Sequence, residues 1–155
     1  MMLKTKRLNL YPASREQMER LIGEQTIPEL RAAYQEMLDG CLRYPEQWAW
    51  YAVWMMEKNG GGETVGTLSF KGLGADGVLE IGYGVNPDYE GQGYTTEAVS
   101  AVVSWAAAQE GVKRIEAETE ESNAASQRVL AKTGFRPNGV LGEEGPRFVW
   151  GGNAE

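Results

Sequence analysis

A short glycine-rich stretch, EGQGYTT at residues 90–96, combines groups that bind anions. It follows the strand-like run VLEIGYGV and precedes valines and alanines at helical spacing. The first amides of a helix lack intrahelical partners and carry about half a positive charge, so they attract anions. Gly91 and Gly93 place no Cβ between these amides and a ligand. Thr95 and Thr96 add hydroxyls, so the stretch predicts main-chain binding of a pyrophosphate or similar anion.

A glycine pair before a helix is also common in ordinary turns, so a plain loop is the alternative reading of this stretch. A dinucleotide-binding turn has a third glycine and a parallel neighbouring strand, and a Walker loop ends in Gly-Lys-Ser or Gly-Lys-Thr. Here threonine stands at the third glycine position, and hairpin turns join the preceding strands. Both of these nucleotide-binding loops are therefore disfavoured.

The proton acceptor must be a carboxylate, a tyrosine or a water chain, because the chain contains no histidine. The same absence disfavours a triad hydrolase or a zinc enzyme, and no metal is expected. Strand alternation in VLEIGYGV places Glu80, Gly82 and Gly84 on one face. Glu118, in the run RIEAETE, is the competing carboxylate on a neighbouring strand. Each glutamate is equally typical of a solvated sheet face.

The elements that position these residues form one alternating series. Alternation and turn residues predict strands in KRLNLYP, QWAWYAVWMMEK, TVGTLSF, VLEIGYGV, RIEAETE and RFVW. Helical spacing predicts helices after Ser14, from Pro28, from about Thr95 to Gln109, and through AASQRVLAKT. An antiparallel meander followed by a helix and a parallel strand predicts a mixed α/β fold with a right-handed crossover.

Composition restricts the class of protein. A chain of 155 residues with 42% apolar and 24% charged residues predicts one globular domain, residues 1–150, and a flexible tail, 151–155. No membrane span or signal peptide is expected, and the single Cys41 favours the cytoplasm. A net charge of −7 disfavours nucleic acid as a partner. It mildly favours a cationic or amine-bearing partner, although solubility alone also explains it.

Three stretches together resemble the GNAT superfamily of acyl-CoA-dependent N-acetyltransferases: EIGYGVNPDYEGQGYTTEA, ESNAASQRVLAKTGF and EEGPRFVW. LKTKRLNLYP and ETVGTLSFKG are similar to the subgroup of ribosomal-protein N-terminal (alanine/serine) acetyltransferases, so the resemblance covers nearly the whole chain. It implies acetyl-CoA as cosubstrate and a mixed, mostly antiparallel sheet of about six to seven strands. It also implies a splayed central parallel pair of strands and about four flanking helices.

The resemblance implies how acetyl-CoA is bound. The family's Gln/Arg-x-x-Gly-x-Gly/Ala loop matches residues 90–95, where Glu90 replaces the usual Gln or Arg. We expect the Glu90 carboxylate to face solvent. The implied coenzyme-binding residues are Val85, Gly91, Gln92, Gly93, Tyr94, Thr95, Thr96, Asn123 and Arg128. A plain helix cap is the alternative role for Asn123, and a solvated basic face shared with Lys132 is the alternative for Arg128.

The resemblance also implies catalytic groups, since attack by an amine on a thioester needs a base and a proton donor for the leaving thiolate. Glu80 matches a position where some relatives carry a catalytic glutamate, and Glu118 would act through a bridging water. Many GNAT enzymes place a tyrosine seven residues after the helix asparagine, which falls on Leu130 here. The subgroup's serine matches Ser126, which is therefore the implied acid, with an ordinary first-turn serine as the alternative.

The predicted acceptor is a primary amine, either a peptide N-terminus or a small molecule, attacked directly in a ternary complex. A homodimer is left open. We expect Trp50, Ala52, Trp54 and Met56 to share one strand face, with core packing favoured over a role in the acceptor site. The alternative function is a non-catalytic acyl-CoA sensor or interaction module on the same fold. Glu90 and the missing tyrosine favour it, whereas Ser126 and Glu80 favour the enzyme.

Overall fold

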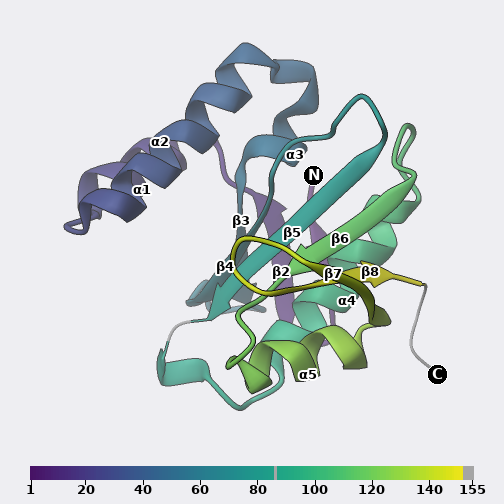
Figure 1. Ribbon diagram of the computed structural model, residues 1–155. Helices are drawn as coiled ribbons and strands as arrows, with labels where there is room; N and C mark the ends of the chain where they lie inside the picture. The colour runs from purple at the N-terminus through teal and green to yellow at the C-terminus, as the bar shows by residue number, and fades with distance from the viewer. Residues whose placement is uncertain (86, 152–155) are drawn as a thin grey trace.

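One eight-stranded sheet, in the order β1-β2-β3-β4-β5-β6-β8-β7, organises the chain (Figure 1). The computed structural model describes residues 1–85 and 87–151, so most of the expected tail lies outside the described residues. The strands are β1 (Leu3–Lys4), β2 (Leu8–Pro12), β3 (Val53–Lys58), β4 (Thr64–Phe70), β5 (Val78–Val85), β6 (Arg114–Glu118), β7 (Phe135–Leu141) and β8 (Pro146–Trp150). The helices are α1 (Arg15–Glu24), α2 (Pro28–Arg43), α3 (Trp48–Tyr51), α4 (Tyr94–Ala107) and α5 (Ala124–Lys132), with 3₁₀ turns η1 (Pro45–Gln47) and η2 (Pro87–Tyr89).

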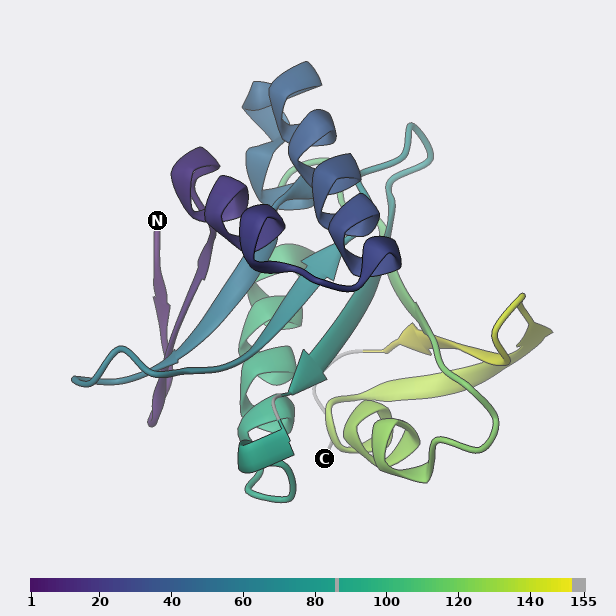
Figure 2. The same ribbon diagram turned by 90° about the vertical axis from the view of Figure 1, so that its left-hand side faces the viewer.

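Alternation along β3 builds a core on each face of the sheet. Trp54 and Met56 are fully buried with the valines of α4, whereas Val53 and Met55 pack against α1 and α2 on the other face. Figure 2 shows α4 running behind β4 and β5 while α1 and α2 lie in front of the sheet. The predicted mixed α/β architecture is therefore confirmed, with short β1 and the unpredicted β7 added to the expected strands.

The aromatic run before β3 folds differently from the prediction. Trp48–Tyr51 forms the short helix α3, so the expectation that Trp50 and Ala52 share a strand face with Trp54 is wrong. Pro45 begins the 3₁₀ turn that leads into this helix, and Trp54 Nε1 donates to the Ala49 carbonyl at 2.8 Å. Core packing is confirmed nevertheless, because Trp50 and Trp54 are both buried.

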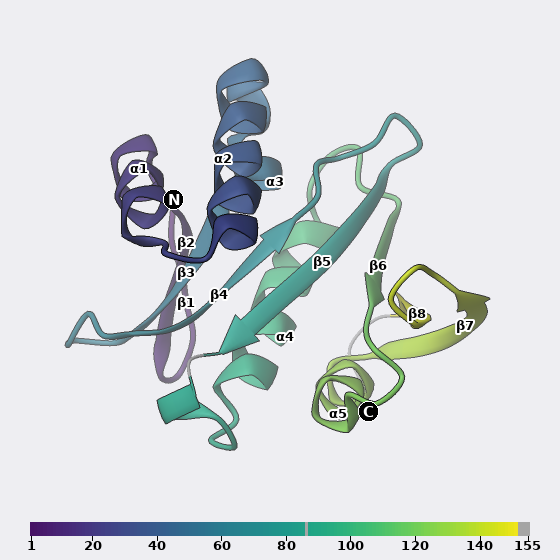
Figure 3. The same cartoon turned by 60° about the vertical axis from the view of Figure 1, so that its left-hand side comes forward.

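The parallel pair β5–β6 opens partway along its length. Its register runs from Val78↔Arg114 to Ile81↔Ala117, whereas β4 continues to pair with β5 as far as Gly66↔Val85. Beyond Ile81 the two strands diverge, and Figure 3 shows the resulting wedge between β5 and β6, with α5 and the start of α4 near its wide end. The expected splay is confirmed. Among the described residues, no helix is long and apolar enough to cross a bilayer.

Candidate active site

A cavity of about 770 Å³ lies at the wide end of the wedge. Its walls come from the end of β5, the loop before α4, the first turn of α4 and one side of α5. Eight of the predicted site residues line it: Gly91, Gly93, Tyr94, Thr95, Thr96, Asn123, Ser126 and Arg128. Segments separated by about thirty residues of sequence thus converge on one space, as a shared binding site requires.

The loop before α4 exposes its amides to this cavity. Gly91 and Gly93 have φ of 75° and 82°, a backbone conformation that other residues adopt only with strain. Gly93 is the N-cap of α4, and no described side chain caps this helix, whereas Ser14 caps α1 and Asn123 caps α5. The N-terminus of α4 therefore keeps unsatisfied donors that face a cavity, which fits a diphosphate.

Gln92, Val85 and Glu90 lie near this loop but are not among the eight predicted residues that line the cavity. Gln92 is not among the lining residues, since its side chain donates to the Asp88 carbonyl at 3.3 Å. Val85 ends β5 opposite Gly66, and its side chain lies outside the described part of the structure. Glu90 is exposed, as expected, and it is also one of the residues that line the cavity.

The α5 wall carries the predicted acid. Asn123 Oδ1 accepts a hydrogen bond from Ser126 N at 3.0 Å, so Asn123 is a helix cap and a cavity residue at once. The Ser126 hydroxyl lies 2.9 Å from Tyr83 Oη, which also donates to the Ser126 carbonyl at 3.2 Å. Burial raises the pKa of Tyr83, and the Ser126 hydrogen bond only partly offsets this rise. Tyr83 therefore keeps its proton at neutral pH.

Tyr83 is a cavity residue with a titratable side chain that the sequence did not single out, and Gly84, Tyr89, Ala125 and Val129 also line the cavity without having been predicted. Tyr83 alternates with Leu79 and Ile81 along β5, a pattern that predicts a core side chain. The only local signal was its position at the end of a splayed strand, two residues before Val85. Leu130, where the family tyrosine would lie, is fully buried instead.

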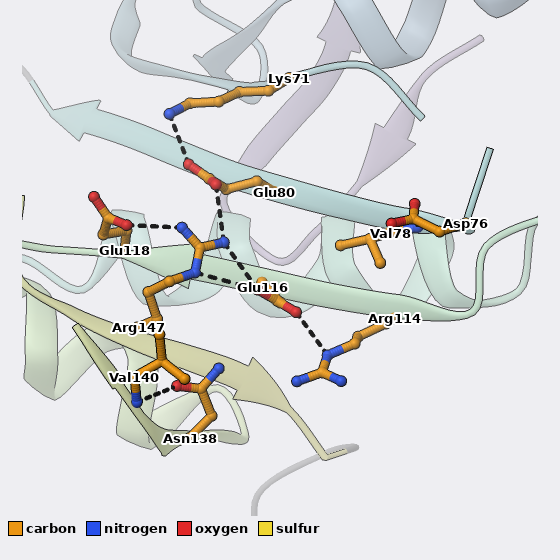
Figure 4. Close-up of polar contacts among 10 residues, drawn as sticks. All are labelled: Lys71, Asp76, Val78, Glu80, Arg114, Glu116, Glu118, Asn138, Val140 and Arg147. Carbon is orange, nitrogen blue, oxygen red and sulfur yellow. Dashed lines mark hydrogen bonds and ion pairs between the residues drawn. The ribbon is translucent and has the colours of Figure 1, made fainter. Parts of the chain in front are cut away.

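Glu80 and Glu118 are not among the lining residues; both belong to an ion-pair network around Arg147 of β8 (Figure 4). Arg147 Nη2 lies 3.0 Å from Glu80 Oε1 and 2.8 Å from Glu116 Oε1, and Nη1 lies 2.7 Å from Glu118 Oε1. Lys71 Nζ approaches Glu80 Oε2 at 2.6 Å. The three glutamates thus share a sheet face and one guanidinium.

The two candidate bases differ in how firmly they are held. Glu118 Oε2 accepts the Glu144 amide at 2.8 Å, and this bond, with that from Arg147, lowers the pKa of Glu118. Both Glu118 oxygens therefore anchor the turn between β7 and β8. Glu80 is bound through Oε2 only to Lys71, whose side chain is 65% exposed, and exposed ion pairs contribute about 0–1 kcal/mol.

The family can now be assigned. A model described as an acetyltransferase (GNAT) domain matches residues 7–136. The chain belongs to the GNAT acetyltransferase family. The resemblance seen in the glycine-rich loop and the last helix is thereby confirmed, and the splayed sheet is the fold that this family implies.

Sequence similarity to individual GNAT proteins covers about half of this chain, whereas structural similarity covers nearly all of it. The uncharacterised N-acetyltransferase YjdG of Bacillus subtilis is 37% identical over 83 residues, covering 53% of this chain. The chain spans about half the length of the curated relatives it matches, 49% in this case.

Two solved structures show the same fold over nearly the full chain. RimL, named a ribosomal L7/L12 α-N-protein acetyltransferase and solved with coenzyme A, has a TM-score of 0.75 at 16% identity, covering 97% of this chain and 96% of its own. A variant of the spermidine N-acetyltransferase SpeG from Vibrio cholerae has a TM-score of 0.72 at 13% identity, covering 94% of each chain.

Proposed function

We propose that this GNAT protein is an N-acetyltransferase that moves an acetyl group from acetyl-CoA to a primary amine. The observation that carries the proposal is the uncapped N-terminus of α4, which opens into the same cavity as Ser126 of α5. Acetyl-CoA supplies the activated acetyl thioester. The chain supplies binding groups, a proton donor and a proton acceptor, and the amine attacks directly in a ternary complex.

The residues present fit the coenzyme along the length of the cavity. The amides from Gly91 to Thr96 would hold the diphosphate, because their helix end is positive and unobstructed by Cβ atoms. Main-chain groups of Val85 and the Nδ2 donors of Asn123 would flank the pantetheine arm. Arg128, and Lys132 one turn later on α5, would meet the adenosine phosphate.

Ser126 is the proposed proton donor to the leaving sulfur. Its hydroxyl lies in the first turn of α5, where the helix end lowers the cost of nearby negative charge. Tyr83 Oη has one proton, which it can give to the Ser126 carbonyl or to Ser126 Oγ. The proposed role uses the second arrangement, because it leaves the serine proton for an acceptor in the cavity.

Glu80 is the proposed proton acceptor, acting on the amine directly or through one water, and Glu118 is the second candidate. An incoming ammonium can replace Lys71 at Glu80 Oε2, because the Lys71 side chain is 65% exposed and can move into solvent. Hydrogen bonds from the Glu144 amide and Arg147 lower the pKa of Glu118, which makes this carboxylate a poorer proton acceptor than an ordinary glutamate. Glu80 would then also recognise a positively charged acceptor, because the acceptor's ammonium takes the place of Lys71.

The acceptor classes to test come from the structural neighbours. RimL is named for a protein N-terminus and SpeG for spermidine, and each of these acceptors carries a primary amine. A panel of peptides with free Ala or Ser N-termini and of polyamines therefore covers the proposed range. The runner-up function is a non-catalytic acyl-CoA sensor, which Glu90 at the cavity wall favours.

The decisive experiment measures release of free coenzyme A thiol with each amine of the panel, alongside calorimetric titration of acetyl-CoA. Amine-dependent thiol release that Ser126→Ala reduces at least tenfold supports the enzyme. Saturable binding without turnover on any amine favours the sensor. If acetyl-CoA gives no saturable heat, the coenzyme site is wrong. Glu80→Gln is expected to slow turnover more than Glu118→Gln, and the reverse order would exchange the two bases.

A further inference from the structure

The turn between β1 and β2 makes direct contact with the first turn of α4. Glu97, in that first turn, accepts hydrogen bonds from Thr5 Oγ1 at 2.5 Å and Arg7 N at 2.8 Å through Oε2. Its Oε1 accepts Arg7 Nε at 2.7 Å. Burial raises the pKa of Glu97, but these bonds from Thr5 and Arg7 outweigh it and lower the pKa overall. The carboxylate is thus ionised and fully engaged on the side away from the cavity.

The position of this carboxylate matters for anion binding. A negative side chain in the first turn of a helix is attracted to the same amides and positive dipole that bind an anionic ligand. In α4 those amides remain without a side-chain cap. Thr5 and Arg7 occupy both oxygens of Glu97, and the Arg7 guanidinium neutralises its charge. The helix end therefore stays open, and an anionic ligand bound there is not repelled by Glu97.

Arg7 also contacts the two residues that flank Gly93 in the glycine-rich loop. Its Nη1 donates to the Gln92 carbonyl at 2.9 Å, and its Cζ lies 4.3 Å from the centroid of the Tyr94 ring. A Cβ built on Gly93 would lie 3.3 Å from Nη2, so side chain and loop are in close contact. In a trans peptide the C=O and N–H point in opposite directions, so the Gly93 amide points away from Arg7. Gly93 itself lines the cavity, whereas Arg7 does not.

We propose that Thr5 and Arg7 are positioning residues for the coenzyme diphosphate. Arg7 fixes the Gln92–Gly93 peptide so that the Gly93 amide faces the ligand, and both residues hold Glu97 away from the amides of α4. The inference rests on the proposed coenzyme site. It predicts that loss of Arg7 weakens only those ligands that carry the diphosphate.

Calorimetry of Arg7→Gln with three probes tests this role: coenzyme A, dephospho-coenzyme A, which retains the diphosphate, and pantetheine, which lacks it. Loss of charge-assisted hydrogen bonds predicts about tenfold weaker binding of both diphosphate ligands. Pantetheine, measured by competition or chemical-shift titration, is expected to keep its affinity. Arg7→Lys, which keeps the charge but not the planar fork, is expected to behave like Arg7→Gln.

Arg15→Gln is the matched control, because Arg15 also pairs with a glutamate, Glu19, at 2.9 Å but on the exposed surface of α1. It is expected to leave all three affinities unchanged. Thr5→Val is a second variant that keeps Arg7 and removes one bond to Glu97, and a smaller loss confined to the diphosphate ligands is expected from it. Thermal unfolding of each variant verifies that the chain is folded.

Four outcomes decide between the roles. Equal loss for pantetheine and coenzyme A assigns Arg7 a merely structural role and overturns the proposal, as does unchanged binding in both the Arg7 and Thr5 variants. Absence of saturable coenzyme A binding in the unmodified protein overturns the proposed site itself, and with it this inference. Weaker binding of coenzyme A and dephospho-coenzyme A, with unchanged binding of pantetheine, supports both the proposed coenzyme site and the positioning role.

Discussion

Tyr83 Oη lies 2.9 Å from Ser126 Oγ and so joins β5 to the first turn of α5 where β5 and β6 have separated. Tyr83 has one proton to donate, and it has two acceptors on Ser126, the carbonyl and the hydroxyl. Only donation to the hydroxyl leaves the serine proton for a group in the cavity. The proposed acid role of Ser126 therefore requires that Tyr83 donate to the hydroxyl.

Replacement of Tyr83 by phenylalanine tests this requirement. With the acceptor found by the amine panel, Tyr83→Phe is expected to lower kcat roughly tenfold and to leave the KM for acetyl-CoA nearly unchanged, because one hydrogen bond in the reacting state is lost. Ser126→Ala is expected to cost more. The double variant is expected to match Ser126→Ala alone, since Tyr83 acts through the serine. Additive losses would assign Tyr83 an independent role.

Leu130 provides a second test, because it occupies the position where many GNAT enzymes carry the acidic tyrosine. Its side chain is fully buried, so the phenol of Leu130→Tyr would have to enter the core. Overpacking and a buried hydroxyl predict a loss of about 1–3 kcal/mol in the free energy of unfolding, with no gain in turnover. Urea unfolding and the thiol-release assay measure the two effects. Faster turnover in a stable variant would place residue 130 in the cavity instead.

Local signals in the sequence predicted the features that depend on a few neighbouring residues. The capping box of Ser14 and Gln17 and the cap at Asn123 are both present. Each of these depends on backbone geometry within about four residues, so the amino-acid type is sufficient evidence for it.

Features that depend on tertiary contacts were not predictable in the same way. β7 was missed because Pro137 and Gly139 interrupt its alternation, and a register irregularity lies between Pro137 and Leu141. Arg147 meets Glu80 and Glu118 only because β8 inserts between β6 and β7. No pattern within a single strand indicates that neighbour relationship, so both glutamates looked like unpaired candidates.

Glu90 is expected to weaken coenzyme binding, because it is an exposed acidic residue that lines the cavity next to the glycines of the proposed diphosphate site. Glu90→Gln should therefore tighten acetyl-CoA binding about two- to fivefold at low salt, the size expected of one exposed charge pair. The gain should shrink at high salt through screening. Calorimetry measures both affinities, and Glu110→Gln, at an exposed site beyond the end of α4, is the control. No change in affinity at low salt would place the Glu90 carboxylate out of reach of the phosphates.

Acid is expected to destabilise the fold through two carboxylates. The amide of Glu144 and the guanidinium of Arg147 lower the pKa of Glu118, and bonds from Thr5 and Arg7 lower that of Glu97 against the effect of burial. In the unfolded chain each group binds its proton near the ordinary value of 4.5, at higher pH than in the folded protein. Their stabilisation is therefore complete above about pH 5.5 and is lost as the pH falls through 4.5 toward the folded pKa values.

Urea unfolding between pH 7 and pH 3.5 measures this loss as a decline in the free energy of unfolding. Glu118→Gln and Glu97→Gln are each expected to be less stable than the unmodified protein at pH 7 and to decline less steeply below pH 4.5, because one titrating group is gone. The curves should therefore converge at low pH. Parallel curves would mean that these hydrogen bonds do not favour the ionised carboxylate. In that case Glu97 would not be an ionised carboxylate held by Thr5 and Arg7 beside α4.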